Sequence, residues 1–382
     1  MTFAVATAVA IEKDLNYYRS IVYIKKKFIK SLEACCSKRI EIYKIWAHWL
    51  IGVLSKNEYN YHLLVPEHIL AAEEHVIKHM TEKGVAHHDA ARIYESLVKD
   101  YGMLYQMFGK EHYEMLKNSK ALYAFSKCIM DHQTADGGLH IITIKDLDVV
   151  IKITTVKYQK IKSQYVGPKE LFIFYLFEHS FNYYLLDGKS LQWSMPGEVF
   201  NYLNTVGLSG ELFASPSNSY HSNFFSLFYV DSFFGSKGNF FSPLTAQRLL
   251  AGGLYEINPP FVEQIFASSC HVICSAMEKC ENVSLGFVYI MPLWSDHQTY
   301  DLLISSPFFI DRLLLEKFQH FYQSGNKYIS ASFDTVLIIV GNLLFRQLDH
   351  SKAILANIKS RFETRPSGSQ MEDNRDHGLI LI

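Results

Sequence analysis

Four consecutive residues, Asn258-Pro259-Pro260-Phe261, form the stretch whose chemistry is most specific. They follow the apolar run 253–257 and open a helical pattern. The amine of an adenine ring is a poor nucleophile because its lone pair is delocalised into the ring. Two hydrogen-bond acceptors, the side-chain oxygen of Asn258 and the backbone carbonyl of Pro259, can localise that lone pair. Each preorganised contact of this kind is worth about 2.7–4 kcal/mol in a transition state. The motif therefore predicts methyl transfer to an aromatic amine.

The two prolines and the phenylalanine complete this predicted catalytic group. Pro259 disfavours the helical conformation at Asn258, and Pro260 restricts its own φ, so both acceptors are presented without further ordering. Phe261 offers a ring on which a base can stack, a contact worth about 1–3 kcal/mol for any base. The alternative is a plain turn after a strand, with Phe261 as an apolar contact of the following helix.

A second candidate element lies upstream and predicts a cofactor site. The short strand Glu211–Ala214 is followed by Ser215-Pro216-Ser217-Asn218, and a strand that ends in small polar residues is where an open α/β sheet binds cofactors. We therefore expect Ala214, Ser215, Pro216, Ser217 and Asn218 to contact the cofactor. Asp231 lies twenty residues past Glu211, a spacing at which a carboxylate meets a ribose hydroxyl. A surface acid in a loop is the alternative for Asp231.

The surrounding elements predict an α/β domain preceded by a helical one. Residues 10–135 show mostly helical periods, and 139–158 change to β-branched residues that indicate either a strand pair or a junction. A helix apolar on nearly all sides is expected at 168–186. Further elements are a helix at 197–203 and strands at 253–257, 285–291, 327–330 and 335–340. We predict a mainly α-helical domain at 1–185, a Rossmann-like domain at 186–345, and a C-terminal helix with a disordered tail at 346–382.

Composition excludes several classes of protein. The 382 residues are 49% apolar and carry a net charge of −1, which excludes a generally basic nucleic-acid coat. Residues 1–60 hold ten Lys/Arg against five Asp/Glu, either an RNA-binding patch or a solvated helix face. The six cysteines show no zinc spacing, so no metal is expected, and Cys270 and Cys274 fit small core residues in a reducing compartment. The opening apolar run is too short for a membrane span and lacks a basic flank, which predicts an intracellular protein without membrane contact.

An ordered series of motifs resembles a known family. The segments are Leu191-Gln192-Trp193-Ser194-Met195-Pro196, residues 211–218, Phe234-Gly235-Ser236-Lys237-Gly238, residues 258–261 and Pro292-Leu293-Trp294. Over about residues 185–345 this series resembles the phosphorylated-CTD-interacting-factor family of cap-specific adenosine N6-methyltransferases. The motif at 258–261 is shared with many methyltransferases, whereas the segments around 213–218 and 234–238 are more specific to this family.

The resemblance implies a Rossmann-like fold and transfer of a methyl group from S-adenosylmethionine to N6 of the cap-adjacent 2′-O-methyladenosine of mRNA. It implies a capped mRNA that starts with adenosine as substrate, and a nuclear location. Animal members carry an N-terminal WW domain that binds the RNA polymerase II tail, and nothing at the start of this chain resembles one, so the tail is a doubtful partner.

Two further departures from the family concern the substrate. Trp193 stands where the family has glycine, and residues 329–334 lack a basic, His-rich insert. Alternatives to the cap enzyme are therefore a catalytically silent RNA- or cap-binding module, and a methyltransferase for DNA or internal RNA positions.

Overall fold

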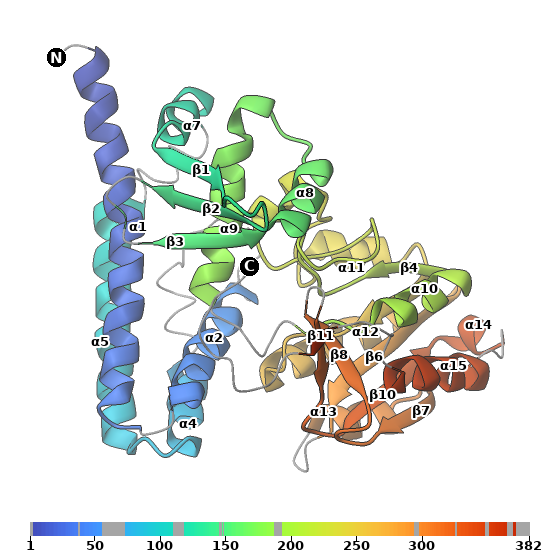
Figure 1. The fold of residues 1–382 in the computed structure, drawn as a ribbon. Helices are drawn as coiled ribbons and strands as arrows, with labels where there is room; N and C mark the ends of the chain where they lie inside the picture. The colour runs from blue at the N-terminus through green and yellow to red at the C-terminus, as the bar shows by residue number, and fades with distance from the viewer. Residues whose placement is uncertain are drawn as a thin grey trace. The chain divides into compact units, whose positions relative to one another are not determined.

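The structure is a computed structural model that describes part of the chain. The described residues are 3–36, 39–55, 73–109, 118–144, 147, 149–186, 193–293, 298–324, 327–347, 351–364 and 370–371. They form two compact units (Figure 1). Unit 1 contains the chain up to residue 189 together with residues 228–234, and unit 2 contains residues 190–227 and 235–379.

Unit 1 is built mainly of helices. They are α1 (Phe3–Glu33), α2 (Arg39–Ser55), α4 (Glu73–Glu82), α5 (His87–Leu104), the π-helical turn η1 (Tyr105–Gly109), α7 (Ser119–Ser126), α8 (Thr155–Gln164), η2 (Lys169–Leu171), α9 (Phe172–Leu186) and the 3₁₀ turn η3 (Tyr229–Phe234). Helix α1 buries Tyr18, Ile21 and Phe28, spaced to lie on one face, and packs against α2, α5 and α7. Helix α9 buries most of its residues, which confirms the prediction of a helix apolar on nearly all sides.

A three-stranded antiparallel sheet interrupts the helices of unit 1. Its order is β1-β2-β3, with β1 at Ile129–Gln133, β2 at Leu139–Ile144 and β3 at Val150–Thr154. Strands β2 and β3 settle the open question about residues 139–158 in favour of a strand pair, which leads into α8. The helical prediction for 10–135 was wrong at β1. Ile129 pairs with Ile144, fifteen residues away, and this non-local pairing outweighs the helical pattern of the preceding residues.

Unit 2 combines a large sheet, a small sheet and six helices among the described residues. The large sheet contains β4 (Leu208–Glu211), β5 (Gly253–Ile257), β6 (Leu285–Pro292), β7 (Phe309–Leu315) and β10 (Thr335–Gly341), and the small one β8 (Phe321–Ser324), β9 (Lys327–Ser330) and β11 (Gln370–Met371). The helices are α10 (Gly197–Thr205), α11 (Pro243–Leu249), α12 (Glu263–Lys279), α13 (Gln298–Ser305), α14 (Leu343–Arg346) and α15 (Ser351–Glu363). Strands β7 and β8 were not predicted from the sequence.

The large sheet is mixed, in the order β4-β5-β6-β10-β7 (Figure 1). Strands β4, β5 and β6 are parallel, and β10 runs antiparallel to both β6 and β7. The connections from β4 to β5 and from β5 to β6 contain α11 and α12, as parallel neighbours require a crossover. This mixed α/β arrangement is consistent with the fold of S-adenosylmethionine-dependent methyltransferases, as the sequence predicts.

Parallel pairing brings the two predicted motifs to one edge of the sheet. Glu211 pairs with Glu256, and the N–H of Leu212 donates to the carbonyl of Glu256 at 3.0 Å. The strand predicted at 211–214 in fact occupies 208–211, because the ladder with β5 decides its limits. The residues after β4 and after β5 therefore leave the sheet side by side at its carboxyl edge.

The C-terminal region is only partly described. Helix α15, within the predicted third region 346–382, packs against α10 and β7 of unit 2. The predicted disordered tail falls mostly on residues 365–369 and 372–382, which lie outside the described residues. No helix in the described part of the chain is long and apolar enough to cross a membrane.

Candidate functional site

Asn258 follows β5 directly, and the two polar atoms of its side-chain amide differ in their hydrogen bonding. Its Nδ2 donates to the backbone carbonyl of Trp193 at 2.9 Å. Its Oδ1 is buried, and no group of the described residues donates to it. The residue is 8% exposed. A buried acceptor left without a donor costs about 1–3 kcal/mol, so an N–H group supplied by a ligand would fit this oxygen.

The rest of the motif connects β5 to α12. The N–H of Val262 donates to the carbonyl of Pro260 at 2.6 Å, and α12 begins at the next residue. The ring of Phe261 is 9% exposed and lies edge-on to Phe333, with the ring centroids 5.4 Å apart. Asn-Pro-Pro-Phe thus also makes the turn that the alternative reading expects, and the turn orients Asn258.

Four rings surround this turn, an aromatic group made of Trp193, Phe261, Tyr322 and Phe333. Trp193 stacks on Phe333, with centroids 5.9 Å apart and planes 10° apart. Tyr322 contacts the other three rings and is fully buried. Trp193 and Phe333 are partly exposed. Sequence reasoning named Trp193 and Phe261 but missed Tyr322 and Phe333, whose aromatic character was the only available signal.

The loop after β4 is held in shape by its own polar side chains. Asn218 Oδ1 accepts from the backbone N–H of Ser215 at 2.7 Å and from Ser215 Oγ at 2.9 Å. The hydroxyl of Ser217 lies 2.9 Å from that of Ser215. Ser215, Pro216 and Ser217 are buried, while Ala214 and Asn218 are partly exposed. The loop is therefore preorganised next to the carboxyl end of β5.

Two buried carboxyl groups lie side by side beneath these motifs. Glu211 Oε1 accepts from the N–H of Tyr220 at 2.6 Å and from that of His221. Its strand partner Glu256 is 2% exposed. Burial, and next the charge of Glu211, raise the pKa of Glu256 well above its usual value. Glu256 lies in β5, two residues before Asn258. Sequence reasoning missed it.

Asp231 belongs to unit 1, whereas the other predicted cofactor residues belong to unit 2. It is fully buried in η3, where its two carboxylate oxygens contact His179 Nδ1 at 2.7 Å and accept from the hydroxyl of Tyr183 at 2.9 Å. The structure thus brings the loop 214–218 and Asn258 together in unit 2 and gives Asp231 partners in α9. Spacing along the sequence could not show that residues 228–234 belong to unit 1 and pack against α9.

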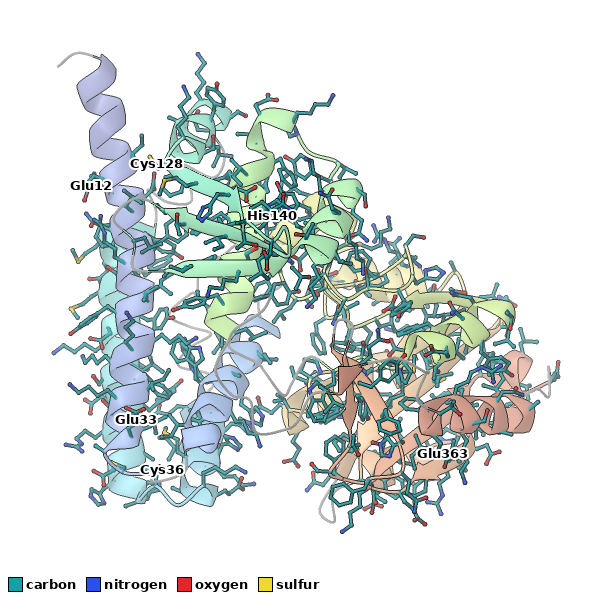
Figure 2. All side chains as sticks on the ribbon, in the orientation of Figure 1. Glu12, Glu33, Cys36, Cys128, His140 and Glu363 are labelled. Carbon is teal, nitrogen blue, oxygen red and sulfur yellow. The ribbon has the colours of Figure 1, made fainter. Side chains whose placement is uncertain are left out.

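The cysteines and other candidate ligands form no metal site in the described residues. None of the six cysteines forms a disulfide. Cys36 lies just after α1, and Cys128 lies in the turn between α7 and β1 (Figure 2). Cys270 is buried, and its hydrogen bond with Cys274 raises the pKa of Cys270 and lowers the pKa of Cys274. Cys270 thus packs in the core as the sequence predicts, whereas Cys274, predicted to do the same, is partly exposed.

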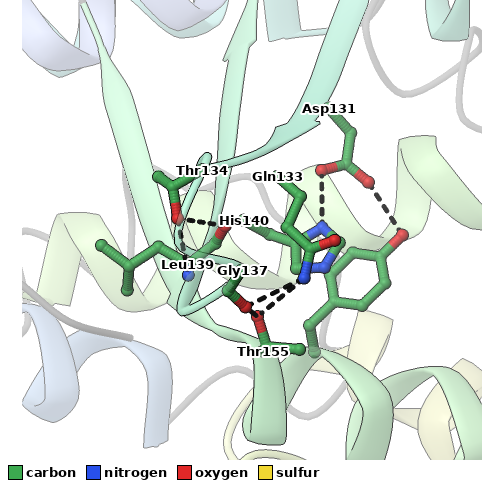
Figure 3. A network of polar contacts seen from close by, with 8 residues as sticks. Asp131, Gln133, Thr134, Gly137, Leu139, His140 and Thr155 are labelled. Carbon is green, nitrogen blue, oxygen red and sulfur yellow. Dashed lines mark hydrogen bonds and ion pairs between the residues drawn. The ribbon is translucent and has the colours of Figure 1, made fainter.

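Unit 1 contains a polar network of its own (Figure 3). The carboxylate of Asp131 contacts His140 Nδ1 at 3.0 Å and accepts from the hydroxyl of Tyr158 at 2.8 Å. The rings of His140 and Tyr158 stack with centroids 3.6 Å apart. Burial, and next the bond to Asp131, raise the pKa of Tyr158. The network joins β1, β2 and α8.

The basic N-terminal stretch is partly engaged within unit 1. Lys25 is 5% exposed and donates to the carbonyl of Tyr184 at 3.0 Å. Lys27 forms an ion pair with Asp100 at 2.6 Å. These two lysines stabilise helix packing, which reduces the charge available for an RNA patch.

Comparison with known proteins agrees with the family resemblance that the sequence motifs indicate. Residues 155–325 match the family model described as phosphorylated CTD interacting factor 1 WW domain. The chain is 32% identical over 201 residues to a human protein named mRNA (2′-O-methyladenosine-N(6)-)-methyltransferase, covering 50% of this chain and 27% of the relative. It is 36% identical over 154 residues to the mouse protein of that name, covering 38% of this chain and 20% of the relative. The chain thus spans about a quarter of the length of these relatives.

Proposed function

The chain is related to the phosphorylated-CTD-interacting-factor family of mRNA methyltransferases, and on that premise we propose that it methylates N6 of an adenine in RNA. The substrate proposed is the cap-adjacent 2′-O-methyladenosine of mRNA, because both relatives are named for that reaction. A nuclear location, which the family resemblance of the motifs implies, is part of the same proposal. Binding to the tail of RNA polymerase II is not part of the proposal.

One observation carries this proposal: the buried Oδ1 of Asn258 receives no donor from the residues that the structure describes. The amide cannot rotate freely, because its Nδ2 is held by the carbonyl of Trp193. The oxygen is therefore presented in one orientation to an incoming amine. By accepting one N–H, it draws the lone pair of the amine out of the ring and toward the methyl donor. The carbonyl of Pro259 would accept the second N–H.

The aromatic group would hold the base in line with these acceptors. Phe333 is partly exposed and lies edge-on to Phe261, and Trp193, also partly exposed, stacks on Phe333. A base entering beside Asn258 would therefore meet ring surfaces. Stacking on such rings positions any base, whereas the paired acceptors select one with an exocyclic amine. The site thus separates positioning from recognition.

The cofactor proposed is S-adenosylmethionine, which supplies an electrophilic methyl group on a sulfonium. The loop 214–218 would hold it, since this loop is closed by its own hydrogen bonds and lies beside the strand that presents Asn258. Glu256, which pairs with Glu211 just before the two motifs, would lie beneath the cofactor between the loop and Asn258. We assign no cofactor role to Asp231, because its carboxylate is occupied by His179 and Tyr183.

A silent RNA- or cap-binding module is the second candidate. The observation that favours it is Trp193, which stands where the family has glycine: its backbone carbonyl holds Asn258 and its ring stacks on Phe333. Such a module would bind capped RNA without turning over the cofactor.

The test combines cofactor binding with turnover. Calorimetry with S-adenosylmethionine comes first, followed by methyl transfer to capped and uncapped RNAs that start with 2′-O-methyladenosine. Transfer to the capped RNA that is lost in Asn258→Ala supports the proposal. Capped-RNA binding without any transfer supports the silent module, and equal transfer to uncapped or internal adenosines contradicts the cap specificity.

A further inference from the structure

Phe318 combines an unusual backbone conformation with an exposed aromatic ring. Among the described residues it is the one non-glycine residue with a positive φ, 63°. A bulky side chain rarely adopts this left-handed region. The ring is 65% exposed. A buried position cannot be the reason for a phenylalanine here.

The conformation of Phe318 is held by hydrogen bonds from both sides. The N–H of Gln319 donates to the carbonyl of Glu316 at 3.1 Å, closing a turn whose third residue is Phe318. The N–H of Phe318 donates to the carbonyl of Ala331 at 2.7 Å, and the N–H of Lys317 donates to Asp334 Oδ1 at 2.7 Å. Glycine is the usual residue at such a place. Strained residues held by their surroundings gather at ligand-binding sites.

The turn is attached to the loop that supplies one ring of the candidate site. Ala331 and Asp334 bracket Phe333, which lies edge-on to Phe261. The turn also follows β7, whose Leu315 pairs with Thr335, and Thr335 pairs with Pro292 at the carboxyl end of β6. Phe318 is therefore displayed at the same edge of the sheet as Asn258.

The strand order sets the separation between the ends of β5 and β7, the strands that precede Asn258 and Phe318. Strands β6 and β10 lie between β5 and β7, so the two ends are about 14 Å apart at about 4.8 Å per strand. A base held by Asn258 at the end of β5 therefore leaves room for a second base at the turn after β7. This separation suits a second nucleotide of the same RNA. Lys317 is exposed next to the ring and can approach a phosphate.

We propose that Phe318 is a stacking platform for an RNA base other than the methyl acceptor. This inference rests on the proposed function and names an additional contact of the same site. The ring would raise the affinity for RNA without touching the reacting amine. Base–aromatic stacking corresponds to about a five- to 150-fold change in binding.

Phe318→Gly separates a role in binding from a role in folding. Glycine accepts a positive φ without strain, so this variant keeps or gains thermal stability. We expect at least about a fivefold loss of affinity for a capped ten-nucleotide RNA in fluorescence anisotropy, with binding of S-adenosylmethionine unchanged. The Phe318→Trp variant, which keeps an aromatic ring at this position, binds the RNA as well as wild type. The matched control is Leu343→Ala, an apolar residue 71% exposed after the other end of β10, which leaves RNA affinity unchanged.

The outcomes distinguish this inference from the proposed function. An active wild-type protein whose Phe318→Gly variant binds RNA equally well overturns the stacking role alone. A fall in melting temperature with loss of cofactor binding shows that Phe318 is structural, which also overturns it. A wild-type protein that binds RNA through Phe318 but transfers no methyl group leaves the platform intact and contradicts the methyltransferase. No RNA binding by wild type overturns the platform, and protein capture through Phe318 would then identify a different kind of partner.

Discussion

The side-chain amide of Asn258 donates through Nδ2 to the backbone carbonyl of Trp193 at 2.9 Å, while its buried Oδ1 has no donor within the described part of the chain. Because the contact involves the backbone of Trp193, it depends on the position of that residue and not on its side chain. The orientation of the acceptor and the nature of the neighbouring ring are therefore separable by mutation.

Asn258→Ala removes the acceptor that the proposed reaction needs most when the amine is localised. We expect kcat to fall by about 10²–10³ while the affinity for RNA changes little. Single-turnover methyl transfer and RNA binding, measured on the same preparations, check this. Loss of stability with unchanged activity per folded molecule would show that the motif is a structural turn.

Trp193→Ala removes a ring but keeps the carbonyl that holds Asn258. We expect KM for RNA to rise about fivefold or more, while kcat stays within about threefold of wild type, because stacking acts in both ground and transition states. Steady-state kinetics on a capped RNA measure both constants. A higher kcat in Trp193→Ala would indicate instead that the ring obstructs the site.

Phe261→Ala differs from Asn258→Ala, because Phe261 packs in the aromatic group and is nearly buried. We expect RNA binding to weaken by about 1–3 kcal/mol, together with a lower melting temperature. Phe261→Tyr keeps the ring and serves as the control. Normal RNA binding by folded Phe261→Ala would exclude a contact with the base.

The free energy of unfolding depends on pH through Glu256, and the direction follows from the raised pKa of its carboxyl group. Its pKa in the folded state is raised by burial and then by Glu211, with Tyr322 also nearby. The folded state therefore binds the proton more tightly than the unfolded chain, whose glutamate titrates near about 4.3. Protonated Glu256 therefore adds to the free energy of unfolding. This contribution is fully present below the unfolded pKa and is lost as pH rises through the folded pKa.

Glu256→Gln imitates the protonated form at every pH. We expect its melting temperature to exceed that of wild type in alkaline buffer and to approach it in acid. Thermal unfolding between about pH 4 and 9 measures the difference, with the exposed Glu278→Gln on α12 as the control. A difference that does not change with pH would contradict the raised pKa.

Asp231→Ala tests the two interpretations of that residue. Removal of the carboxylate deletes the buried acceptor that His179 and the hydroxyl of Tyr183 share, which we expect to cost about 1–3 kcal/mol of stability. Binding of S-adenosylmethionine by the folded fraction should be unchanged. Chemical denaturation and calorimetry measure the two effects, and a selective loss of cofactor binding would restore the role predicted from spacing.

The sequence by itself determined the features that depend on neighbouring residues. The limits of β5, the helix α9 and the motif 258–261 could be predicted because apolar runs, helical periodicity and proline restrict the backbone locally. The family resemblance was likewise available from short motifs.

Tertiary structure decided what depends on contacts between distant residues. The limits of β4 follow from its pairing with β5, and β1 exists because Ile129 meets Ile144. Trp193 holds Asn258 across sixty-five residues, Phe333 reaches Phe261 from a later loop, and Asp231 packs with His179 in unit 1. None of these pairs leaves a periodic signal, since hydrogen bonds and burial act through space and not along the chain.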